Sequence, residues 1–592
     1  MNFAAVRHIP KSPMAYAQDE ETLHIYLETA KDDLQKAELI AGDPFDYIKL
    51  EGKYRWRPSS EKNLAMEKLY SGRHLDYWFL EVKAPSKRTK YAFILHAGGS
   101  RYFYGPRRIS EIKEGFDLYD PFEYFNYPDI PKEDLPTFPE WAKNTVWYQI
   151  FPERFARKGP AGSHLPWDSV REGITNHHLF GGNLAGIRER LPYLADLGIT
   201  GIYLTPIFEA FSAHKYDTID YFKIDPQFGT EADFRELVRE CHSLGIRIIL
   251  DAVFNHCGWF HPFFQDVIKR KKASPYWDCF FIEDENFIDF PISSSGLPLV
   301  PENHRLKFRT FGKTALMPKL NTAHPFLEEY LLRVARYWIE EFDIDGWRLD
   351  VSNEISHEFW RKFRKTVKAV KPDAYIVGEN WDDANLWLRG DQFDAVMNYE
   401  LAHPLWKFFS GEIDGEEFSL RINELLVKYP KNVAPYMYNL LDSHDTMRML
   451  KRVGDNKEKL KLAFVFLFAF TGSPALFYGD EIGLTGGGDP DCRRCMIWGE
   501  GQDRELFAFF KRLISIRKEN PDFTAPDLIW ISTDDCLAFR KQNTIIIINN
   551  SPAERVFRFE ETLSDLETGK QKEEIKINPY GYRILKKVRP MV

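Results

Sequence analysis

Residues 346–354 read GWRLDVSNE, a short apolar strand that ends in polar and charged side chains. Seven other apolar segments of similar length occur between residues 146 and 479, and amphipathic segments lie between several of them. Alternation of short apolar strands with helices is typical of a parallel sheet, so this region predicts an α/β fold, a (β/α)8 TIM barrel with insertions. The eight candidate strands are VWYQI (146–150), GIYLT (201–205), RIILD (247–251), GWRLD (346–350), YIVGE (375–379), DAVMN (394–398), NLLDSH (439–444) and PALFYG (474–479).

Two of the intervening segments show a clear helical spacing. Leucine and isoleucine recur at 184, 187, 191 and 194, and a second apolar series occupies positions 234, 237, 238 and 241. Thr230 and Asp233 precede the second series at the spacing of a capping box, which predicts the start of that helix.

The segments that flank the barrel are rich in predicted strands. TLHIYLE (22–28), YWFLEV (77–82) and YAFILHA (91–97) predict an N-terminal β-sandwich, and LAFRK, TIIIINN and RVFRFE predict a C-terminal β-sandwich. The long aromatic segment after the third barrel strand predicts an excursion domain. The predicted domains are the N-terminal sandwich (1–135), the barrel (136–520) with its excursion domain (about 257–318), and the C-terminal domain (521–592).

The composition is that of a globular protein and excludes several classes of partner. The chain has 592 residues and a net charge of −9, so neither nucleic acid nor an anionic membrane is an expected partner. Its 15% of aromatic residues fits large cores or sugar recognition, and composition does not decide between them. Six cysteines do not make a disulfide scaffold, and the start of the sequence shows no signal-peptide pattern, so we expect a cytoplasmic enzyme.

Polar side chains follow the barrel strands at their carboxyl ends, where a barrel places its active site. Asp350 ends the fourth strand, Glu379 the fifth and His444 the seventh, and DAVFNH (251–256) follows the third. A single carboxylate at such a position is often a helix cap or an ion-pair partner. Four strand ends that carry acids, histidines and an arginine instead predict one catalytic site.

The spacing of Arg348 and Asp350 predicts a difference between two carboxyl groups. Residues two apart on a strand point to the same side, so the guanidinium should keep the pKa of Asp350 low, as a nucleophile needs. Glu379 has no cation beside it in the sequence, and neighbouring carboxylates should raise its pKa, as an acid needs. Two carboxyl groups with opposite requirements are typical of glycoside cleavage. The alternative is a structural ion pair of Arg348 with Asp350.

The motifs resemble those of the α-amylase family of glycoside hydrolases. DAVFNH, GWRLDVSNE, VGENW and LLDSHD look like its four signature segments, in the same order. MPKLN (317–321), the WYQIFPERF segment and the opening AVRHIPKSPMAYAQDEETLHI are similar to the neopullulanase, cyclomaltodextrinase and maltogenic amylase group of this family. This resemblance spans nearly the whole chain.

The resemblance implies roles for individual residues. Asp350 would be the nucleophile, Glu379 the acid/base, and Asp445 the third carboxylate, which binds ring hydroxyls of the sugar. Both carboxyl groups of a retaining enzyme would lie about 5–5.5 Å apart. The same sugar would contact further substrate-binding residues, namely Tyr216 by stacking, His256 and His444 by hydrogen bonds, and Arg493 in GGGDPDCRR.

The resemblance also implies an acceptor side. Asn353 and Glu354 stand where the group carries the same pair, and Trp381 would be a stacking platform for an acceptor sugar. These residues would influence the choice between α-1,4 and α-1,6 linkages and between water and sugar acceptors. For Glu354 the alternative is a charge that stabilises the start of a helix.

One segment departs from the family. Relatives often bind calcium in a loop after the first strand and at a Gly-Gly-Asp, but here the loop is FARKGPAGSHLPW (155–167) and the later segment is FGGNL (180–184). Arg157 and Lys158 stand where oxygen ligands would be expected, and Asn183 replaces the carboxylate. Calcium requires several oxygen ligands, so we expect no required cofactor and a lost metal site that Lys158 fills.

The predicted function is a retaining hydrolase of cyclodextrins, maltooligosaccharides and pullulan-type α-glucans, with transglycosylation. An α-glucosidase or a glucan transglycosylase on the same scaffold remains an alternative, and a non-catalytic interaction protein is a remote one. The resemblance also implies a homodimer, in which the N-terminal domain of one protomer covers the site of the other.

Overall fold

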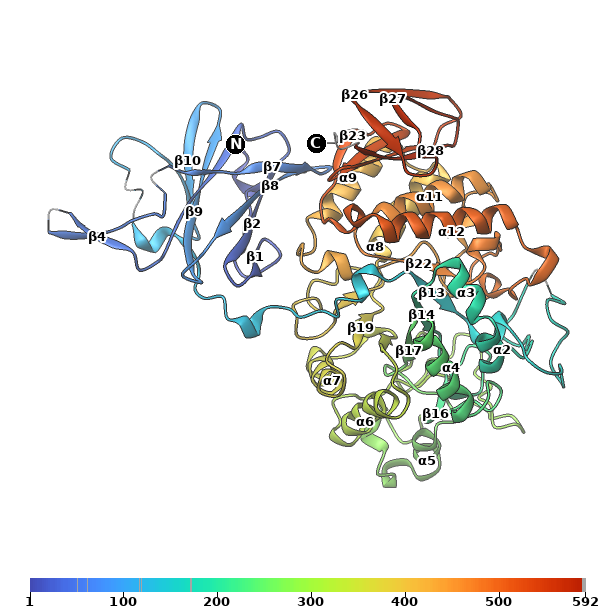
Figure 1. Cartoon of the computed structure of the whole chain (residues 1–592). Helices are drawn as coiled ribbons and strands as arrows, with labels where there is room; N and C mark the ends of the chain where they lie inside the picture. The colour runs from blue at the N-terminus through green and yellow to red at the C-terminus, as the bar shows by residue number, and fades with distance from the viewer. Residues whose placement is uncertain (51, 61, 117, 119, 171–172, 588–592) are drawn as a thin grey trace. The chain divides into compact units, whose positions relative to one another are not determined.

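The computed structural model describes residues 1–587 except 51, 61, 117, 119, 171 and 172. It divides into two compact units, which Figure 1 shows as a cartoon. One unit comprises Met1–Thr137 and Ile413–Ala434, and the other comprises Phe138–Glu412 and Pro435–Val592. The first unit thus takes in helix α9 (Gly415–Leu426), whose Asn423 side chain donates to the carbonyl of Ser71 over 2.9 Å.

The core of the first unit lies between two antiparallel sheets, so the predicted N-terminal β-sandwich is confirmed, and a separate two-stranded sheet pairs β4 (Tyr47–Leu50) with β5 (Lys53–Trp56). Leu27 and Trp78 of one sheet and Leu39 and Phe93 of the other belong to one buried apolar core. One sheet has the order β1-β2-β8-β7, with β1 (Ala15–Asp19), β2 (Thr22–Ala30), β8 (Leu75–Lys83) and β7 (Glu67–Ser71). The other has the order β11-β10-β9-β3-β6, with β11 (Ile109–Glu111), β10 (Ser100–Tyr104), β9 (Thr89–Ala97), β3 (Lys36–Gly42) and β6 (Leu64–Ala65), and β12 (Phe125–Tyr127) also pairs with β9.

The second unit contains the predicted eight-stranded parallel barrel, which is confirmed. Its strands follow the order β20-β19-β18-β17-β14-β13-β22-β21, and a single parallel bridge between Met397 and Tyr438 joins the two end strands. The seventh strand is shorter than predicted, because residues 440–444 leave the ladder after Asn439 and run toward the site. In chain order the strands are β13 (Trp147–Ile150), β14 (Gly201–Leu204), β17 (Arg247–Ala252), β18 (Gly346–Leu349), β19 (Tyr375–Gly378), β20 (Ala395–Val396), β21 (Tyr438–Asn439) and β22 (Ser473–Phe477).

Helices cover the barrel, and two of the predicted helical segments can be compared with the structure. The capping box of α4 is present, because Thr230 and Asp233 exchange hydrogen bonds at its start. The helix predicted from Leu184 to Leu194 is instead two helices, because Pro192 has no N–H to continue the first one. The larger helices are α2 (Leu184–Glu189), α3 (Leu191–Leu197), α4 (Glu231–Ser243), α5 (Pro262–Arg270), α6 (Pro325–Phe342), α7 (His357–Val370), α8 (Tyr399–Ser410), α11 (Lys457–Ala469) and α12 (Arg504–Glu519).

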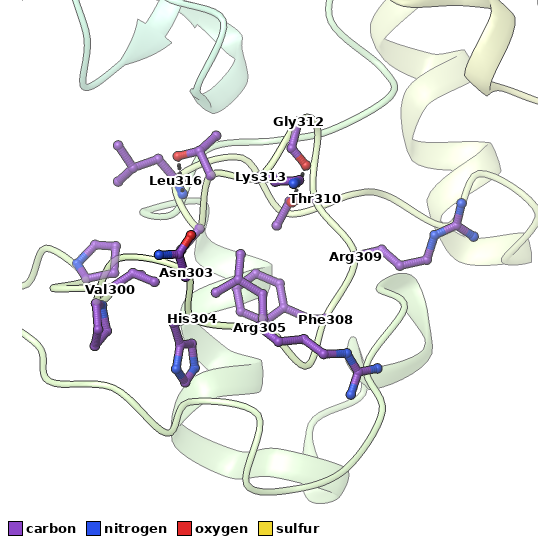
Figure 2. A pocket seen from close by; sticks show the side chains of 15 residues that line it. Val300, Asn303, His304, Arg305, Phe308, Arg309, Thr310, Gly312, Lys313 and Leu316 are labelled. Atoms are coloured by element: carbon purple, nitrogen blue, oxygen red, sulfur yellow. Dashed lines mark hydrogen bonds between the residues drawn. The ribbon is translucent and has the colours of Figure 1, made fainter.

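The excursion segment leaves the barrel after β17 and returns beside the same strand. An antiparallel bridge joins His256 to Lys319, so the start and end of the segment lie next to each other. Between them the chain forms α5 and several irregular loops. Residues 298–316 surround a cavity of about 860 Å³ in this segment, shown in Figure 2. Thr310 and Gly312 lie on a loop at one side of this cavity.

The C-terminal strands form one antiparallel sheet of order β23-β24-β25-β28-β26-β27. Helix α11 contacts both β22 of the barrel and β25 of this sheet, and Figure 1 shows α11 and α12 between the two. The strands are β23 (Ile529–Ser532), β24 (Cys536–Lys541), β25 (Thr544–Asn549), β26 (Arg555–Asp565), β27 (Gln571–Ile577) and β28 (Tyr582–Lys587).

Candidate active site

Arg348 lies at the centre of the site and binds three carboxylates from three neighbouring strands. Its Nη1 lies 3.0 Å from both oxygens of Asp251 and 2.7 Å from Oδ1 of Asp350. Its Nη2 lies 2.8 Å from Oε2 of Glu379. All four side chains are buried. The two carboxylates expected to do the chemistry therefore meet the two terminal nitrogens of one guanidinium.

Asp350 follows β18 directly and presents one carboxylate oxygen without a partner. Its Oδ2 is buried and accepts no hydrogen bond from any residue that the structure describes. Burial raises the pKa of Asp350 well above its ordinary value, Arg348 acts in the opposite direction, and the Glu379 carboxylate adds to the increase. The prediction of a low pKa is therefore wrong, because it considered the guanidinium without burial and without the other two acids.

Glu379 follows β19, and its carboxylate is held by two hydrogen-bond donors and by the ion pair with Arg348. Its Oε2 accepts the backbone N–H of Val351 over 2.9 Å, besides the contact with Arg348. Its Oε1 accepts the indole N–H of Trp381 over 3.0 Å. Glu379 has no cation beside it in the sequence, but in the fold Arg348 reaches it from the neighbouring strand.

His444 and Asp445 follow β21, and Arg493 connects them. The Arg493 Nε donates to the carbonyl of His444 over 2.7 Å, and its Nη2 lies 3.4 Å from Oδ1 of Asp445. Oδ2 of Asp445 lies 3.2 Å from Nε2 of His444. The structure thus brings the predicted third carboxylate, a predicted histidine and the predicted arginine together.

Tyr216 joins this group to the central arginine cluster. Its hydroxyl donates to Oδ2 of Asp251 over 2.9 Å and lies 2.5 Å from Nε2 of His444, and the Tyr216 and His444 rings are stacked at an angle of 3°. Burial lowers the pKa of His444 well below its ordinary value, so the ring is neutral. Because the amide of Gln149 donates to Nδ1 over 2.6 Å, the ring proton lies on Nε2.

His256 follows β17 and has a buried side chain. Its ring stacks on Phe311 at 4.9 Å, and its Nε2 has no hydrogen-bond partner in the described part of the chain. Burial lowers the pKa of His256 to about 3, so this nitrogen belongs to a neutral ring. A neutral histidine with a vacant ring nitrogen suits a sugar hydroxyl, which both donates and accepts hydrogen bonds.

The residues predicted for the acceptor side are the exposed ones. Trp381 is 43% exposed and stacks face to face on Tyr399, with ring centres 3.8 Å apart. Asn353 and Glu354 are exposed on the short turn Ser352–Glu354, and the Glu354 carboxylate lies 2.9 Å from Nζ of Lys319.

Three residues of the site were missed by the sequence-based selection. Asp251 belongs to the segment DAVFNH, whose pattern indicated no role for it, although it binds Arg348 and Tyr216. Gln149 is a polar residue inside the apolar segment VWYQI. A polar residue at a core position of a strand could have indicated that its side chain belongs to the site. Lys319 lies in MPKLN, and nothing in its spacing indicated that it reaches Glu354.

The segment in which a lost metal site is expected has its own internal contacts. Lys158 Nζ lies 2.7 Å from the carboxylate of Glu189. The Asn183 side chain accepts the N–H of Gly186 over 2.8 Å, which caps α2, and donates to the carbonyl of Lys158 over 3.0 Å. Within the described ranges, no group of three or more histidine, cysteine, aspartate or glutamate side chains is arranged to hold a metal ion.

Comparison with known proteins agrees with this geometry. The family model "Alpha amylase, catalytic domain" matches residues 149–503, and "Alpha amylase, N-terminal ig-like domain" matches residues 1–130. The chain is 48% identical over 567 residues to a cyclomaltodextrinase of Geobacillus thermopakistaniensis (strain MAS1), covering 93% of this chain and 92% of that protein. It is 45% identical over 542 residues to an intracellular maltogenic amylase of Bacillus subtilis, covering 90% and 88%. A solved structure of a cyclomaltodextrinase matches with a TM-score of 0.89 at 38% identity, covering 99% of this chain and 100% of that chain.

The barrel, the carboxylates at its strand ends and these matches define a glycoside hydrolase. Among the residues that the structure describes, no helix has the length and apolar character to cross a membrane. The chain belongs to the α-amylase family, in the group of cyclomaltodextrinases, maltogenic amylases and neopullulanases.

Proposed function

We propose that this enzyme hydrolyses α-glucosidic bonds in cyclodextrins, maltooligosaccharides and pullulan-type glucans with net retention of configuration. The observation that carries the proposal is the pair of carboxylates on one guanidinium. Asp350 and Glu379 contact the two terminal nitrogens of Arg348, and Oδ2 of Asp350 has no partner within the described residues. Retaining glycosidases require two carboxyl groups close enough to act on one bond.

In the first step, Oδ2 of Asp350 forms a bond to the anomeric carbon of the sugar. The bond from that carbon to the glycosidic oxygen breaks, and the carboxyl proton of Glu379 moves to the departing oxygen. This step requires negative charge on Asp350 and a proton on Glu379. Arg348 contacts both groups and stabilises the carboxylate that is ionised at each stage.

In the second step, the Glu379 carboxylate accepts a proton from water or from a sugar hydroxyl. The oxygen of that acceptor bonds to the anomeric carbon, and the ester bond to Asp350 breaks. Two inversions give retention. Water as the acceptor gives hydrolysis, and a sugar gives transglycosylation.

The remaining residues bind the sugar on either side of the bond. Nε2 of His256 and the Asp445 carboxylate bind hydroxyl groups of the reacting sugar, and Arg493 holds Asp445. Tyr216, packed on His444, stacks against the ring of the same sugar. The exposed ring of Trp381 suits stacking against an acceptor sugar, next to Asn353 and Glu354.

We also propose that the enzyme acts in the cytoplasm as a homodimer without a required metal ion. The name of the intracellular maltogenic amylase relative supports the location, and Lys158 supports the loss of the calcium site. Sedimentation analysis of the full chain tests the dimer: a monomer at micromolar concentration would contradict it.

A substrate panel with product stereochemistry tests the function. The full-length enzyme is assayed on β-cyclodextrin, maltotriose, pullulan and soluble starch, and the anomer released first is identified by proton NMR. We expect α-anomers and a higher kcat/KM on cyclodextrin than on starch. A preference for starch would count against the substrate class, release of single glucose units from chain ends would indicate the α-glucosidase alternative, and β-anomers would overturn the mechanism.

A further inference from the structure

Lys319 places a buried ammonium group among three oxygen atoms. Its Nζ lies 2.9 Å from Oε2 of Glu354 and 3.2 Å from the carbonyl oxygen of the same residue, and it also donates to Oδ1 of Asn255. The residue is 6% exposed. Burial lowers the pKa of Lys319, and the Glu354 carboxylate opposes that effect. An ammonium with three donors is satisfied by three acceptors in this arrangement.

The three segments that meet at this ammonium are far apart in the sequence. Asn255 follows β17, Lys319 lies at the end of the excursion segment, and Glu354 ends the turn after β18. Backbone hydrogen bonds fix Lys319 itself, because its N–H donates to the carbonyl of Arg309 over 2.9 Å and the next N–H donates to Asn255 over 3.0 Å. The ammonium therefore extends from a fixed backbone.

The turn that Lys319 holds is also bonded to the proposed acid/base. The N–H of Val351 donates to Oε2 of Glu379 over 2.9 Å, and the hydroxyl of Ser352 donates to the backbone carbonyl of Glu379 over 2.6 Å. Val351 has a left-handed backbone with φ of 45°, which a β-branched residue adopts only where its surroundings enforce it. One end of the turn thus contacts Glu379 and the other contacts Lys319.

We propose that Lys319 is a positioning residue for the acceptor side of the reaction. It holds the Glu354 carboxylate and the Ser352–Glu354 turn so that an incoming sugar hydroxyl is oriented toward Glu379, and it thereby favours transfer to sugars over hydrolysis. The Glu354 carboxylate is 45% exposed, so it reaches Lys319 with one oxygen and leaves the other available to an acceptor. This proposal rests on the proposed function, in which Glu354 lines the acceptor side.

The test compares Lys319→Met with a matched control, Lys368→Met. Lys368 on α7 is also largely buried, and its Nζ contacts the Asp394 carboxylate at 2.9 Å and the carbonyl of Ala374 at 2.6 Å, at the amino end of the barrel strands. Both variants lose an ammonium that binds one carboxylate and one backbone carbonyl. The readout is the ratio of transfer to hydrolysis with maltotriose as donor and glucose as added acceptor.

We expect Lys319→Met to lower this ratio about tenfold, the loss expected for one hydrogen bond to a charged group. Lys368→Met should lower the melting temperature and leave the ratio unchanged. In a Glu354→Gln background, Lys319→Met should change the ratio less than about twofold, because the two residues act through one contact.

Equal ratios for Lys319→Met and Lys368→Met, or independent effects of Lys319→Met and Glu354→Gln, would overturn the proposal. If Lys319→Met does not fold, Lys319→Gln replaces it. The glutamine amide can still donate hydrogen bonds to the neutral oxygens of Asn255 and of the Glu354 backbone, but it carries no charge. The ratio should again fall, and an unchanged ratio would overturn the proposal. A wild-type enzyme that cleaves no α-glucoside would instead overturn the proposed function, and this proposal with it.

Discussion

The indole N–H of Trp381 donates to the carboxylate of Glu379 over 3.0 Å. The same ring packs on Tyr399 at 3.8 Å and is 43% exposed. One side chain therefore contacts the proposed acid/base and presents an exposed aromatic surface to the proposed acceptor side. These two functions are separable by mutation.

Trp381→Phe keeps an aromatic ring and removes the hydrogen bond to Glu379. A hydrogen bond to a charged group contributes about 1.5–3 kcal/mol, so we expect kcat to fall by about tenfold or more with little change in KM. Trp381→Ala removes the ring as well and should also raise KM for maltooligosaccharides. Steady-state kinetics of both variants on the same substrate provide the comparison. Equal KM values for the Phe and Ala variants would argue against a stacking platform.

The two proposed catalytic carboxyl groups should respond differently to the leaving group. Glu379→Gln removes the proton donor and should lower kcat on β-cyclodextrin by about 10²–10⁴-fold. An aryl α-maltoside with an acidic phenol needs no protonation, so its first step should be restored in this variant. Asp350→Asn should lose about 10⁴-fold or more on both substrates. Pre-steady-state release of the phenol measures the rate of the first step. If this rate were restored in Asp350→Asn but not in Glu379→Gln, Asp350 would be the acid/base and Glu379 the nucleophile.

Asp345, at the amino end of β18, is a buried carboxylate that should make the stability of the fold depend on pH. It is fully buried, and its oxygens lie 2.8 Å from Nε2 of His242 and 3.0 Å from Nζ of Lys371. Burial by itself raises the pKa of this carboxyl, but the hydrogen bond from His242 and the charge of Lys371 outweigh it and lower the pKa from 3.8 to about 2. A lowered folded-state pKa stabilises the fold above the unfolded pKa, and this stabilisation is lost as the pH falls through the folded value.

We therefore expect Asp345→Asn to lower the free energy of unfolding by about 2 kcal/mol near neutral pH. The difference from the wild type should stay constant down to about pH 4.5 and shrink below about pH 4. Urea unfolding at several pH values measures it. Asp343→Asn is the control, because this neighbouring side chain is 70% exposed and asparagine tolerates its left-handed backbone. If the difference in the free energy of unfolding between Asp345→Asn and the wild type were the same at all pH values, the lowered pKa of Asp345 would be contradicted.

Chelation tests the expected loss of the calcium site. Because Lys158 pairs with Glu189 and the Asn183 side chain is used as a helix cap, we expect EDTA to change neither kcat nor the melting temperature. The measurement is thermal unfolding and cyclodextrin hydrolysis before and after exhaustive treatment with EDTA. A loss of stability that calcium restores would show that oxygen ligands remain in this protein.

The parts of the structure that follow from local pattern were predictable. Apolar strands that alternate with helices predicted the barrel, and polar residues at strand ends predicted most of the side chains that the structure brings together, because both patterns depend on short spacing. The break at Pro192 was visible in the sequence, since proline removes one helical hydrogen bond.

The parts that depend on long side chains crossing between segments were not predictable. Arg348 reaches Glu379 on the next strand, and burial dominates the pKa of Asp350; neither follows from spacing along β18. Lys319 reaches Glu354 from an irregular segment without periodicity, so its role depends on the folded excursion.

The most direct measurement is the trapping of the covalent intermediate. The enzyme is treated with 5-fluoro-α-glucosyl fluoride, which forms the sugar ester but slows its hydrolysis, and the labelled peptide is sequenced by mass spectrometry. We expect one sugar per chain, attached to Asp350 and absent in Asp350→Asn. A label on Asp445 or Glu379, or turnover without any covalent adduct and with inversion at the anomeric carbon, would contradict the double displacement.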